Sequence, residues 1–275
     1  ASGALNGLFR VRTFTQDDAH IFMREDQIES EVIKLINFID RMYSVFDLTY
    51  DIELSTRPEE KYIGSIDVWN KSEDALKKAC EDSGHTCKIN PGDGAFYGPK
   101  LDFHIKDSLG RVWQCGTIQL DMNLPERFDL TYIDENGEKK RPVMLHRVIY
   151  GSIERFIGIL IENYAGAFPL WLSPVQVNII PVNNEYHSEY AKSICDMLKN
   201  KNIRVNVDER DEKLSYKMRE AQTKKIPITL VLGDKERDNN LVSYRLYGKS
   251  ETTTISKEEF ANLVVDTINS KKYNI

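Results

Sequence analysis

The segment that begins at Arg10 holds an unusual density of polar side chains. Arg10 and Arg12 lie two positions apart, so they share one face if the segment forms a strand. After a turn, Gln16, Asp18 and His20 repeat this spacing, and a second strand would place these three side chains on one face as well. The pattern predicts either a substrate-binding sheet face or an exposed face rich in salt bridges, and by itself it favours neither.

A second candidate site surrounds His146, which stands in an apolar, strand-like run. Ser152 is a suitable N-cap for the helix that follows, and it places Arg155 in the first helical turn. A cation there opposes the helix dipole by about 0.3–1 kcal/mol, but it strengthens the helix N-terminus as a phosphate site. Gly158 costs about 1 kcal/mol relative to alanine, which indicates close contact with a neighbour or a ligand. The alternative for Arg155 is an ion pair with Glu154 or with another nearby carboxylate.

The elements of the first half must position these residues. Short strands separated by turn residues dominate there, and such runs indicate an antiparallel sheet. We expect two strands within residues 8–23, helices over Glu25–Phe46, Ser72–Cys80 and Ile153–Tyr164, and strands over Lys100–Ile105, Val112–Leu120, Phe128–Ile133 and Arg141–Ile149.

Beyond Pro169 and Pro174 the pattern changes to alternating strands and helices. This alternation predicts a small α/β domain with helices on both faces of its sheet. We therefore expect two domains, residues 1–168 and residues 169–275. The second contains strands over Val175–Ile180, Ile203–Val207, Ile226–Leu232 and Leu241–Leu246, and helices over Glu185–Leu198, Lys213–Ala221 and from a capping box at Ser256 onward.

The composition is that of a globular protein, with 41% hydrophobic residues, 29% charged residues and a net charge of −6. No run approaches the roughly 20 apolar residues of a membrane span, and no signal-peptide pattern opens the chain. Four cysteines without a CxxC pair favour a cytoplasmic protein over a disulfide-bonded secreted one. From Phe168 onward, 17 Lys and Arg face 15 Asp and Glu, which fits either a polyanion-binding face or a solvated helix surface.

Several segments resemble one family closely. The run from Phe9 to Phe22 resembles motif 2 of class II aminoacyl-tRNA synthetases, and the run from Val143 to Gly158 resembles motif 3. The match is closest to the threonyl-tRNA synthetases, whose motifs are similar, in the same order, to Leu54–Glu59, Gly94–Lys100, Gln114–Asp121 and Val143–Arg147. The resemblance implies an α+β fold: an antiparallel class II catalytic sheet with flanking helices, followed by a small α/β anticodon-binding domain.

The resemblance also implies a zinc site that recognises threonine. In this family one Cys and two His bind the ion, and His20 and His146 match the two histidines. Threonine completes the coordination through its amino group and hydroxyl, and Asp18 matches the residue that accepts the hydroxyl proton. A site built for the hydroxyl separates threonine from valine, which a hydrophobic pocket does poorly.

The remaining implied roles concern ATP, the adenylate and tRNA. Arg10 and Arg155 match residues that bind ATP phosphates, with magnesium, and Phe14 matches the ring that stacks on adenine. Expected partners are L-threonine, ATP and threonine tRNA, with a homodimer in the full-length protein and neither a membrane nor DNA. Residues around the adenylate are matched by Tyr97, Lys100, Gln114 and Gln119, of which Gln114 is also an ATP-binding candidate, and Gln16 is a further substrate-binding candidate. Lys100 is a catalytic candidate together with Arg10 and Arg155. Anticodon-reading positions are matched by Arg219, Glu236 and Arg245.

The chain departs from the family pattern at its start. It begins inside motif 2 without an initiator Met, so we expect a fragment that lacks motif 1, which the family uses for dimerisation. The first arginine of motif 2 and the zinc-binding cysteine are missing as well. Cys115 matches a cysteine that the family does not use for zinc. We therefore expect an incomplete metal site in this chain.

Two alternatives remain. One is a prolyl-, histidyl- or glycyl-type class II synthetase, which the set of Asp18, His20 and His146 argues against, because those enzymes lack this zinc arrangement. The other is a synthetase-like module that binds tRNA or an amino acid without catalysis. The presence of Arg10, Arg155 and Gln114 argues against such a module, whereas the missing upstream ligands argue for it.

Overall fold

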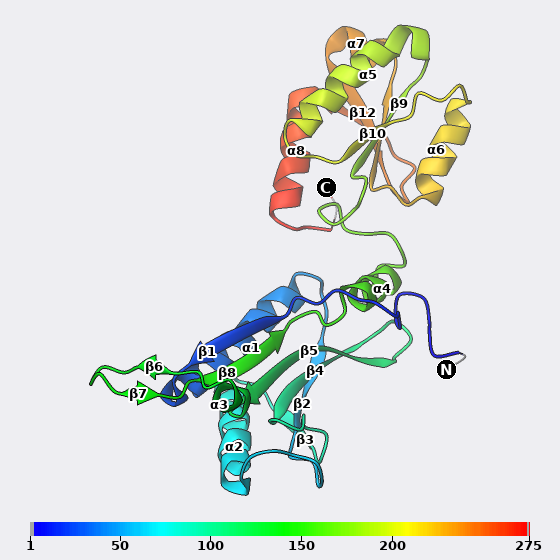
Figure 1. Cartoon of the computed structure of the whole chain (residues 1–275). Helices are drawn as coiled ribbons and strands as arrows, with labels where there is room; N and C mark the ends of the chain where they lie inside the picture. The colour runs from blue at the N-terminus through cyan, green and yellow to red at the C-terminus, as the bar shows by residue number, and fades with distance from the viewer. Residues whose placement is uncertain (1–2, 274) are drawn as a thin grey trace. The chain divides into compact units, whose positions relative to one another are not determined.

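The computed structural model describes residues 3–273 and 275, which form two compact units (Figure 1). The first unit ends at Asn163 and the second begins at Tyr164. The domain boundary expected between residues 168 and 169 stays a prediction.

A six-stranded sheet forms the centre of the first unit, with the strand order β1-β8-β5-β4-β2-β3. All neighbouring strands are antiparallel except the pair β2–β3, which is parallel. A separate two-stranded hairpin, β6–β7, extends from it. The strands are β1 (Ala19–Met23), β2 (Tyr50–Ser55), β3 (Cys87–Asn90), β4 (Lys100–Lys106), β5 (Val112–Asp121), β6 (Tyr132–Ile133), β7 (Lys139–Lys140) and β8 (Val143–Val148).

Helices cover one face of this sheet, because its strands alternate apolar and polar residues. Ile118 and Leu145, from the central strands β5 and β8, are completely buried, whereas the neighbouring Gln119 and His146 pair in register and remain partly accessible. Tyr43 is also fully buried and donates its hydroxyl proton to the carbonyl of Ile149 at 2.6 Å. The helices of this unit are α1 (Ile28–Ser44), preceded by the 3₁₀ turn η1 (Glu25–Gln27), and α2 (Ile66–Asp82), α3 (Leu124–Arg127) and α4 (Ile153–Asn163).

The expectation of two strands within residues 8–23 was half wrong. Only β1 forms, and before it the chain makes isolated bridges, one of which joins Gln16 to Ser152. The reason is a set of side chain–backbone hydrogen bonds: the carboxylate of Asp17 accepts from the amides of Ile149 and Tyr150, at 2.8 and 2.9 Å. These bonds hold the segment on the turn between β8 and α4. Arg10 and Arg12 therefore do not share a strand face.

Two further expectations needed correction. The strand expected over Phe128–Ile133 shrinks to the two residues of β6, because α3 and the turn after it occupy the preceding positions; the amide of Leu130 donates to the carbonyl of Pro125 at 2.9 Å. The helix expected over Ser72–Cys80 begins earlier, at Ile66, where the hydroxyl of Ser65 accepts from the amide of Val68 at 3.3 Å.

The second unit is a five-stranded sheet in the order β10-β9-β11-β12-β13, with the first three strands parallel and the others antiparallel. Figure 1 shows α6 on the side of the sheet opposite α5 and α8, as the alternating pattern predicted. The elements are β9 (Val177–Pro181), α5 (Asn184–Lys199), β10 (Val205–Val207), α6 (Leu214–Thr223), β11 (Ile228–Leu232), α7 (Asp234–Asn239), β12 (Leu241–Leu246), β13 (Thr253–Ser256) and α8 (Lys257–Asn269).

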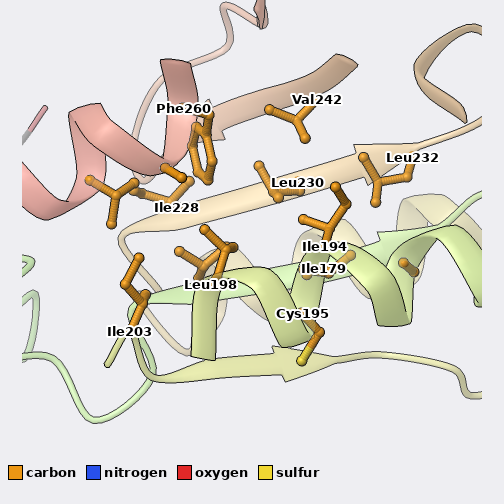
Figure 2. Packing of buried hydrophobic residues seen from close by; sticks show 14 of the residues in the cluster. Ile179, Ile194, Cys195, Leu198, Ile203, Ile228, Leu230, Leu232, Val242 and Phe260 are labelled. Atoms are coloured by element: carbon orange, nitrogen blue, oxygen red, sulfur yellow. The ribbon is translucent and has the colours of Figure 1, made fainter. Parts of the chain in front are cut away.

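An apolar core fills the space between the sheet of the second unit and the helices α5 and α8. Ile179 and Leu230 from adjacent strands pack against Leu198 of α5 and Phe260 of α8, and all four are at most 1% exposed (Figure 2). The expected cap of the last helix is confirmed, because the hydroxyl of Ser256 accepts from the amide of Glu259 at 3.2 Å. Among the described residues, no helix combines the length and apolar character that a membrane span requires.

Candidate active site

A cavity of about 520 Å³ lies in the first unit, where the segment before β1, the strands β5 and β8, and the start of α4 come together. The structure gathers most of the predicted site residues in its wall. Neither Lys100 nor His20 belongs to the wall. The predicted residues that line the cavity are Arg10, Phe14, Gln16, Asp18, Tyr97, Gln114, Gln119, His146 and Arg155.

Arg155 is held by backbone and aromatic contacts and not by a carboxylate. Its Nε donates to the carbonyl of Phe9 at 3.0 Å, and its guanidinium lies over the ring of Trp113, 5.2 Å from the centroid. The hydroxyl of Ser152 accepts from the amide of Arg155 at 3.3 Å, as the predicted cap requires. Among the described residues Arg155 forms no ion pair, and the carboxylate of Glu154 instead accepts from the amide of Thr15. The charge of Arg155 is therefore available to an anion.

Gly158 explains how the N-terminal segment reaches this helix. A Cβ at this position would lie 3.3 Å from Cε2 of Phe9 and 3.4 Å from Cβ of Leu8, which is tighter than most real contacts. The glycine therefore admits a neighbouring segment, the one that leads to Arg10. Phe14, further along the segment, lines the cavity and is 52% exposed, so part of its ring is accessible to a planar ligand.

Tyr97 reaches the cavity on a loop that presses directly against β5. A Cβ at Gly98 would lie 1.8 Å from the carbonyl oxygen of Leu120, so only glycine fits there. The side chain of Asn123 donates to the carbonyl of Tyr97 at 2.6 Å and holds the same loop. The hydroxyl of Tyr97 donates to Oε1 of Gln119, and burial, with smaller contributions from nearby carboxylates, raises the pKa of Tyr97.

Lys100 lies outside the cavity wall because two carboxylates hold it. Its Nζ is 2.7 Å from Oδ2 of Asp102 and 3.5 Å from Oδ2 of Asp93. The predicted role of Lys100 at the adenylate therefore requires its side chain to leave at least part of this arrangement.

The two histidines that were predicted to act together lie side by side. His20 of β1 and His146 of β8 are register partners, with ring centroids 4.8 Å apart and an interplanar angle of 76°. Nε2 of His146 is 2.9 Å from Oδ2 of Asp121, a fully buried carboxylate. Asp18, two residues before His20, lines the same cavity as His146.

The three anticodon candidates are only partly together. Glu236 and Arg245 line a cavity of about 230 Å³ in the second unit, whereas Arg219 is exposed on α6 and does not line it. Burial acts to raise the pKa of Glu236, but hydrogen bonds from the hydroxyl of Ser243 at 2.6 Å and the amide of Gly233 at 3.0 Å outweigh it, so the pKa is lowered. Nε of Arg245 is buried without a partner among the described residues, which leaves a donor for a ligand.

Comparisons with known proteins agree with this division. Residues 1–164 match the family described as the tRNA synthetase class II core domain (G, H, P, S and T), and residues 176–267 match the anticodon binding domain family. A threonine–tRNA ligase from Fusobacterium nucleatum subsp. nucleatum is 59% identical over 267 residues, which are 96% of this chain and 43% of that protein. The threonine–tRNA ligase from Acetivibrio thermocellus is 56% identical over 271 residues, 98% of this chain and 42% of that protein. The chain belongs to the threonine–tRNA ligase family.

A solved structure supports the same conclusion about the fold of this family member. The crystal structure described as the RNA binding domain of threonyl-tRNA synthetase from Cryptosporidium parvum Iowa II matches with a TM-score of 0.91 and 39% identity, over 100% of this chain and 68% of that one. The predicted fold class and family are therefore confirmed. The chain spans less than half the length of the two ligases named above.

The zinc site that the family pattern implies is only partly supplied by the described residues. No group of three or more His, Cys, Asp or Glu residues arranged for a metal occurs among them. His20 and His146 give two adjacent imidazoles, and three protein donors with an open position are the usual catalytic arrangement. Cys115 is buried and belongs to no group of three or more such donors among the described residues, so it does not complete the set.

Sequence reasoning missed the carboxylates that hold the site in place. Asp17 anchors the N-terminal segment, Asp121 contacts His146, and Asp102 contacts Lys100. One signal could have revealed Asp102: with Lys100 it forms a pair of opposite charges on one face of a strand that is otherwise mostly apolar.

Proposed function

We propose that the chain carries the threonine-activation site and the anticodon-binding domain of a threonine–tRNA ligase. The protein would convert L-threonine and ATP into threonyl-adenylate and pyrophosphate, and then transfer the threonyl group to the 3′ end of threonine tRNA. One observation carries this proposal above all: His20 and His146 meet in register next to a cavity that also holds Asp18, Arg10 and Arg155.

The chemistry would rest on positioning and charge stabilisation. Arg10 and Arg155 would bind the phosphates of ATP with magnesium, and the exposed ring of Phe14 would stack on adenine. Gln16, Tyr97 and Gln119 line the same cavity and would hold threonine. A carboxylate oxygen of threonine attacks the α-phosphorus, the bond to pyrophosphate breaks, and pyrophosphate leaves. No side chain acts as a covalent nucleophile, so the barrier is lowered by alignment and by the fixed guanidinium charges.

Threonine would be recognised through its hydroxyl. His20 and His146 would provide two protein donors to zinc, and no preformed group among the described residues supplies a third. Bound zinc would supply open positions for the amino group and the hydroxyl of the substrate. Asp18 would accept the hydroxyl proton, which valine lacks. A buried polar site left unpaired by valine discriminates strongly, whereas a methyl-sized difference does not.

The second unit would bind the anticodon loop. Glu236 and Arg245 line one cavity and offer a carboxylate and a guanidinium donor, which suit the edges of unpaired bases. Arg219 would contact the tRNA from outside this cavity. We propose that the full-length protein works as a homodimer in the cytoplasm, with threonine tRNA as its nucleic-acid partner and neither DNA nor a membrane.

The proposal is tested with a chimera in which this chain replaces the matching C-terminal part of the Fusobacterium nucleatum relative. We expect threonine-dependent exchange of pyrophosphate into ATP, and none with proline, histidine or glycine. Exchange with one of those amino acids would contradict the threonine assignment. The chain alone should bind zinc weakly or below one equivalent, and tight one-to-one binding would show that another ligand completes the site.

A second candidate function is favoured by the incomplete metal-donor set among the described residues. In this alternative the protein is a tRNA- or amino-acid-binding module without catalysis. The same chimera separates the two: tRNA binding without any exchange supports the module, whereas threonine-dependent exchange rules it out.

A further inference from the structure

A buried carboxylate beneath the active-site cavity connects several of its side chains. Asp102 of β4 is 1% exposed. Its Oδ2 accepts from the hydroxyl of Ser55 at 2.8 Å and from Nζ of Lys100 at 2.7 Å. Its Oδ1 accepts from Nε2 of Gln114 at 2.5 Å and from the hydroxyl of Thr117 at 3.2 Å. All four contacts therefore bring a donor to the carboxylate.

This arrangement dictates which way the amide of Gln114 faces. A carboxylate that forms an ion pair with Lys100 can only accept hydrogen bonds, so the NH₂ group of Gln114 must point at Asp102. The second hydrogen of the same NH₂ group goes to the hydroxyl oxygen of Thr117 at 3.0 Å. Thr117 can accept it because its own proton is donated to Asp102. Both amide hydrogens of Gln114 are thus used below the cavity.

Of the side-chain amide of Gln114, only the oxygen Oε1 is left for a ligand. Gln114 lines the cavity, and Oε1 has no hydrogen-bond partner among the described residues. Gln119, on the same strand and in the same cavity, has the opposite polarity, because its Oε1 accepts from the hydroxyl of Tyr97. Gln119 therefore presents its NH₂ group to the cavity.

We propose that Asp102 is a positioning residue that fixes Gln114 as a hydrogen-bond acceptor, so that the cavity beside Gln114 takes a hydroxyl or amino group of the ligand. Gln119 correspondingly takes an acceptor, such as a carboxylate or phosphate oxygen. The orientation of Gln114 follows from the contacts of Asp102 alone; the identification of the ligand with ATP rests on the proposed function. Asp102 also keeps Lys100 out of the cavity wall.

The first experiment needs no ligand. In the 275-residue chain, NMR identifies the side-chain NH₂ signals of Gln114 by their loss in Gln114→Ala. We expect these hydrogens to exchange with water at least about tenfold more slowly than those of a solvent-exposed glutamine, because bonds to a charged carboxylate are strong. Asp102→Asn should remove this protection, since asparagine lets the amide of Gln114 turn over.

Two variants make this test independent of the stability of Asp102→Asn. Ser55→Ala removes a bond to Oδ2 only and should leave the Gln114 signals unchanged. Thr117→Val removes the acceptor of one Gln114 hydrogen and should accelerate the exchange of one hydrogen and not the other. The proposal would be overturned if the Gln114 side-chain hydrogens are unprotected in the unsubstituted chain. It would also be overturned if their exchange rates change in neither Asp102→Asn nor Thr117→Val.

The second experiment identifies the ligand group. Binding of ATP is compared with binding of 2′-deoxy-ATP, 3′-deoxy-ATP and inosine triphosphate, each of which lacks one donor. We expect one analogue to bind about tenfold more weakly to the unsubstituted chain, and this difference to shrink to less than about threefold in Asp102→Asn, as the loss of one oriented hydrogen bond predicts. Equal binding of all four nucleotides, or an unchanged difference in Asp102→Asn, would overturn the acceptor role.

Failure of the proposed function would look different. If the unsubstituted chain binds none of the nucleotides while the Gln114 hydrogens are protected and respond to Asp102→Asn, the positioning by Asp102 stands and the ATP assignment falls.

Discussion

The two units hold polar side chains on a sheet in different ways. In the first unit, polar residues project from the middle of strands β5 and β8 into a cavity, and carboxylates with almost no exposure hold them from below, Asp102 beneath Gln114 and Asp121 beside His146. In the second unit, the sheet face that packs against α5 and α8 is apolar (Figure 2), and Arg245 retains a buried donor without a partner among the described residues.

The polar side chains of the first unit are therefore fixed before a ligand binds, whereas Arg245 in the second unit keeps a donor that a ligand can use. A buried carboxylate that accepts several hydrogen bonds fixes rotamers before any ligand arrives, which suits a site where charge must be stabilised without rearrangement. A guanidinium with an unused buried donor is more weakly specified until a ligand supplies the acceptor. The comparison predicts that substitutions in the first unit change reaction rates and that substitutions in the second change folding or RNA affinity.

The largest effect should come from the core of the second unit. Phe260→Ala should lower the free energy of unfolding of that unit by about 3–5 kcal/mol, because it removes a fully buried ring and leaves a cavity. Hydrogen exchange measured by mass spectrometry reports each unit separately. The exposed Tyr186→Ala is the control and should change stability by less than about 0.5 kcal/mol. Equal loss of protection in the sheet of the first unit would contradict the division into two units.

The arginines of the cavity should come next. Arg155→Ala in the chimera should reduce threonine-dependent pyrophosphate exchange by about 10²–10³-fold, as expected for the loss of one donor that stabilises developing charge. Arg10→Ala should behave similarly. Arg12, two residues along the chain, is exposed and does not line the cavity, so Arg12→Ala should leave the rate unchanged. A comparable loss of rate in Arg12→Ala would indicate that Arg10 and Arg12 do share one face, as they would in a strand.

The carboxylate beside His146 should have a smaller and more selective effect. Asp121→Asn in the chimera should raise the KM for threonine by about 10–100-fold, the usual range for partners of metal-binding histidines, and leave the KM for ATP unchanged. Asp129→Asn is the matched control, since the Asp129 side chain is 89% exposed and pairs with Arg141 at the surface. A parallel rise in the KM for ATP would mean that Asp121 supports the whole cavity and not one histidine.

The smallest effect concerns acid stability of the second unit. A hydrogen bond from Arg210 lowers the pKa of Asp208 below its ordinary value of 3.8, and the bonds described above lower that of Glu236 below 4.5. Both groups therefore stabilise the folded state above those ordinary values, and this contribution is lost as the pH falls through the lowered values. Urea unfolding should show constant stability from pH 7 to about 5 and a decline below about 4.5.

Asp208→Asn tests that assignment. The variant should be less stable than the unsubstituted chain at neutral pH and should show a shallower decline in acid. An unchanged decline would assign the acid sensitivity to other carboxylates.

The sequence predicted most helices and strands because they follow from local patterns, whereas the cavity residues Phe14, Tyr97, Gln114 and Gln119 were expected only from the family resemblance. The strand Leu241–Leu246 and the Ser256 cap depend on alternation and capping rules that act over a few residues, and both agree with the structure. The residues before β1 were misjudged because their conformation depends on Asp17 bonding amides that lie more than 130 residues away. No local rule reports such a bond.

The positions of Lys100 and His20 could not be read from the sequence for a related reason. The motif places Lys100 near the adenylate, but its side chain follows the two carboxylates that neutralise it. His20 faces the ring of His146 across the strand pair, and the register that brings the two rings together is set by the whole sheet.

The most direct test of the account measures how well the chimera separates threonine from valine. The ratio of kcat/KM for the two amino acids in pyrophosphate exchange is compared between the unsubstituted chimera and the variants Asp18→Ala and His146→Ala. If the paired imidazoles and the aspartate recognise the hydroxyl, the unsubstituted ratio is at least about 10⁴ and each variant lowers it by at least about a hundredfold. A ratio that survives both substitutions would show that threonine is selected elsewhere.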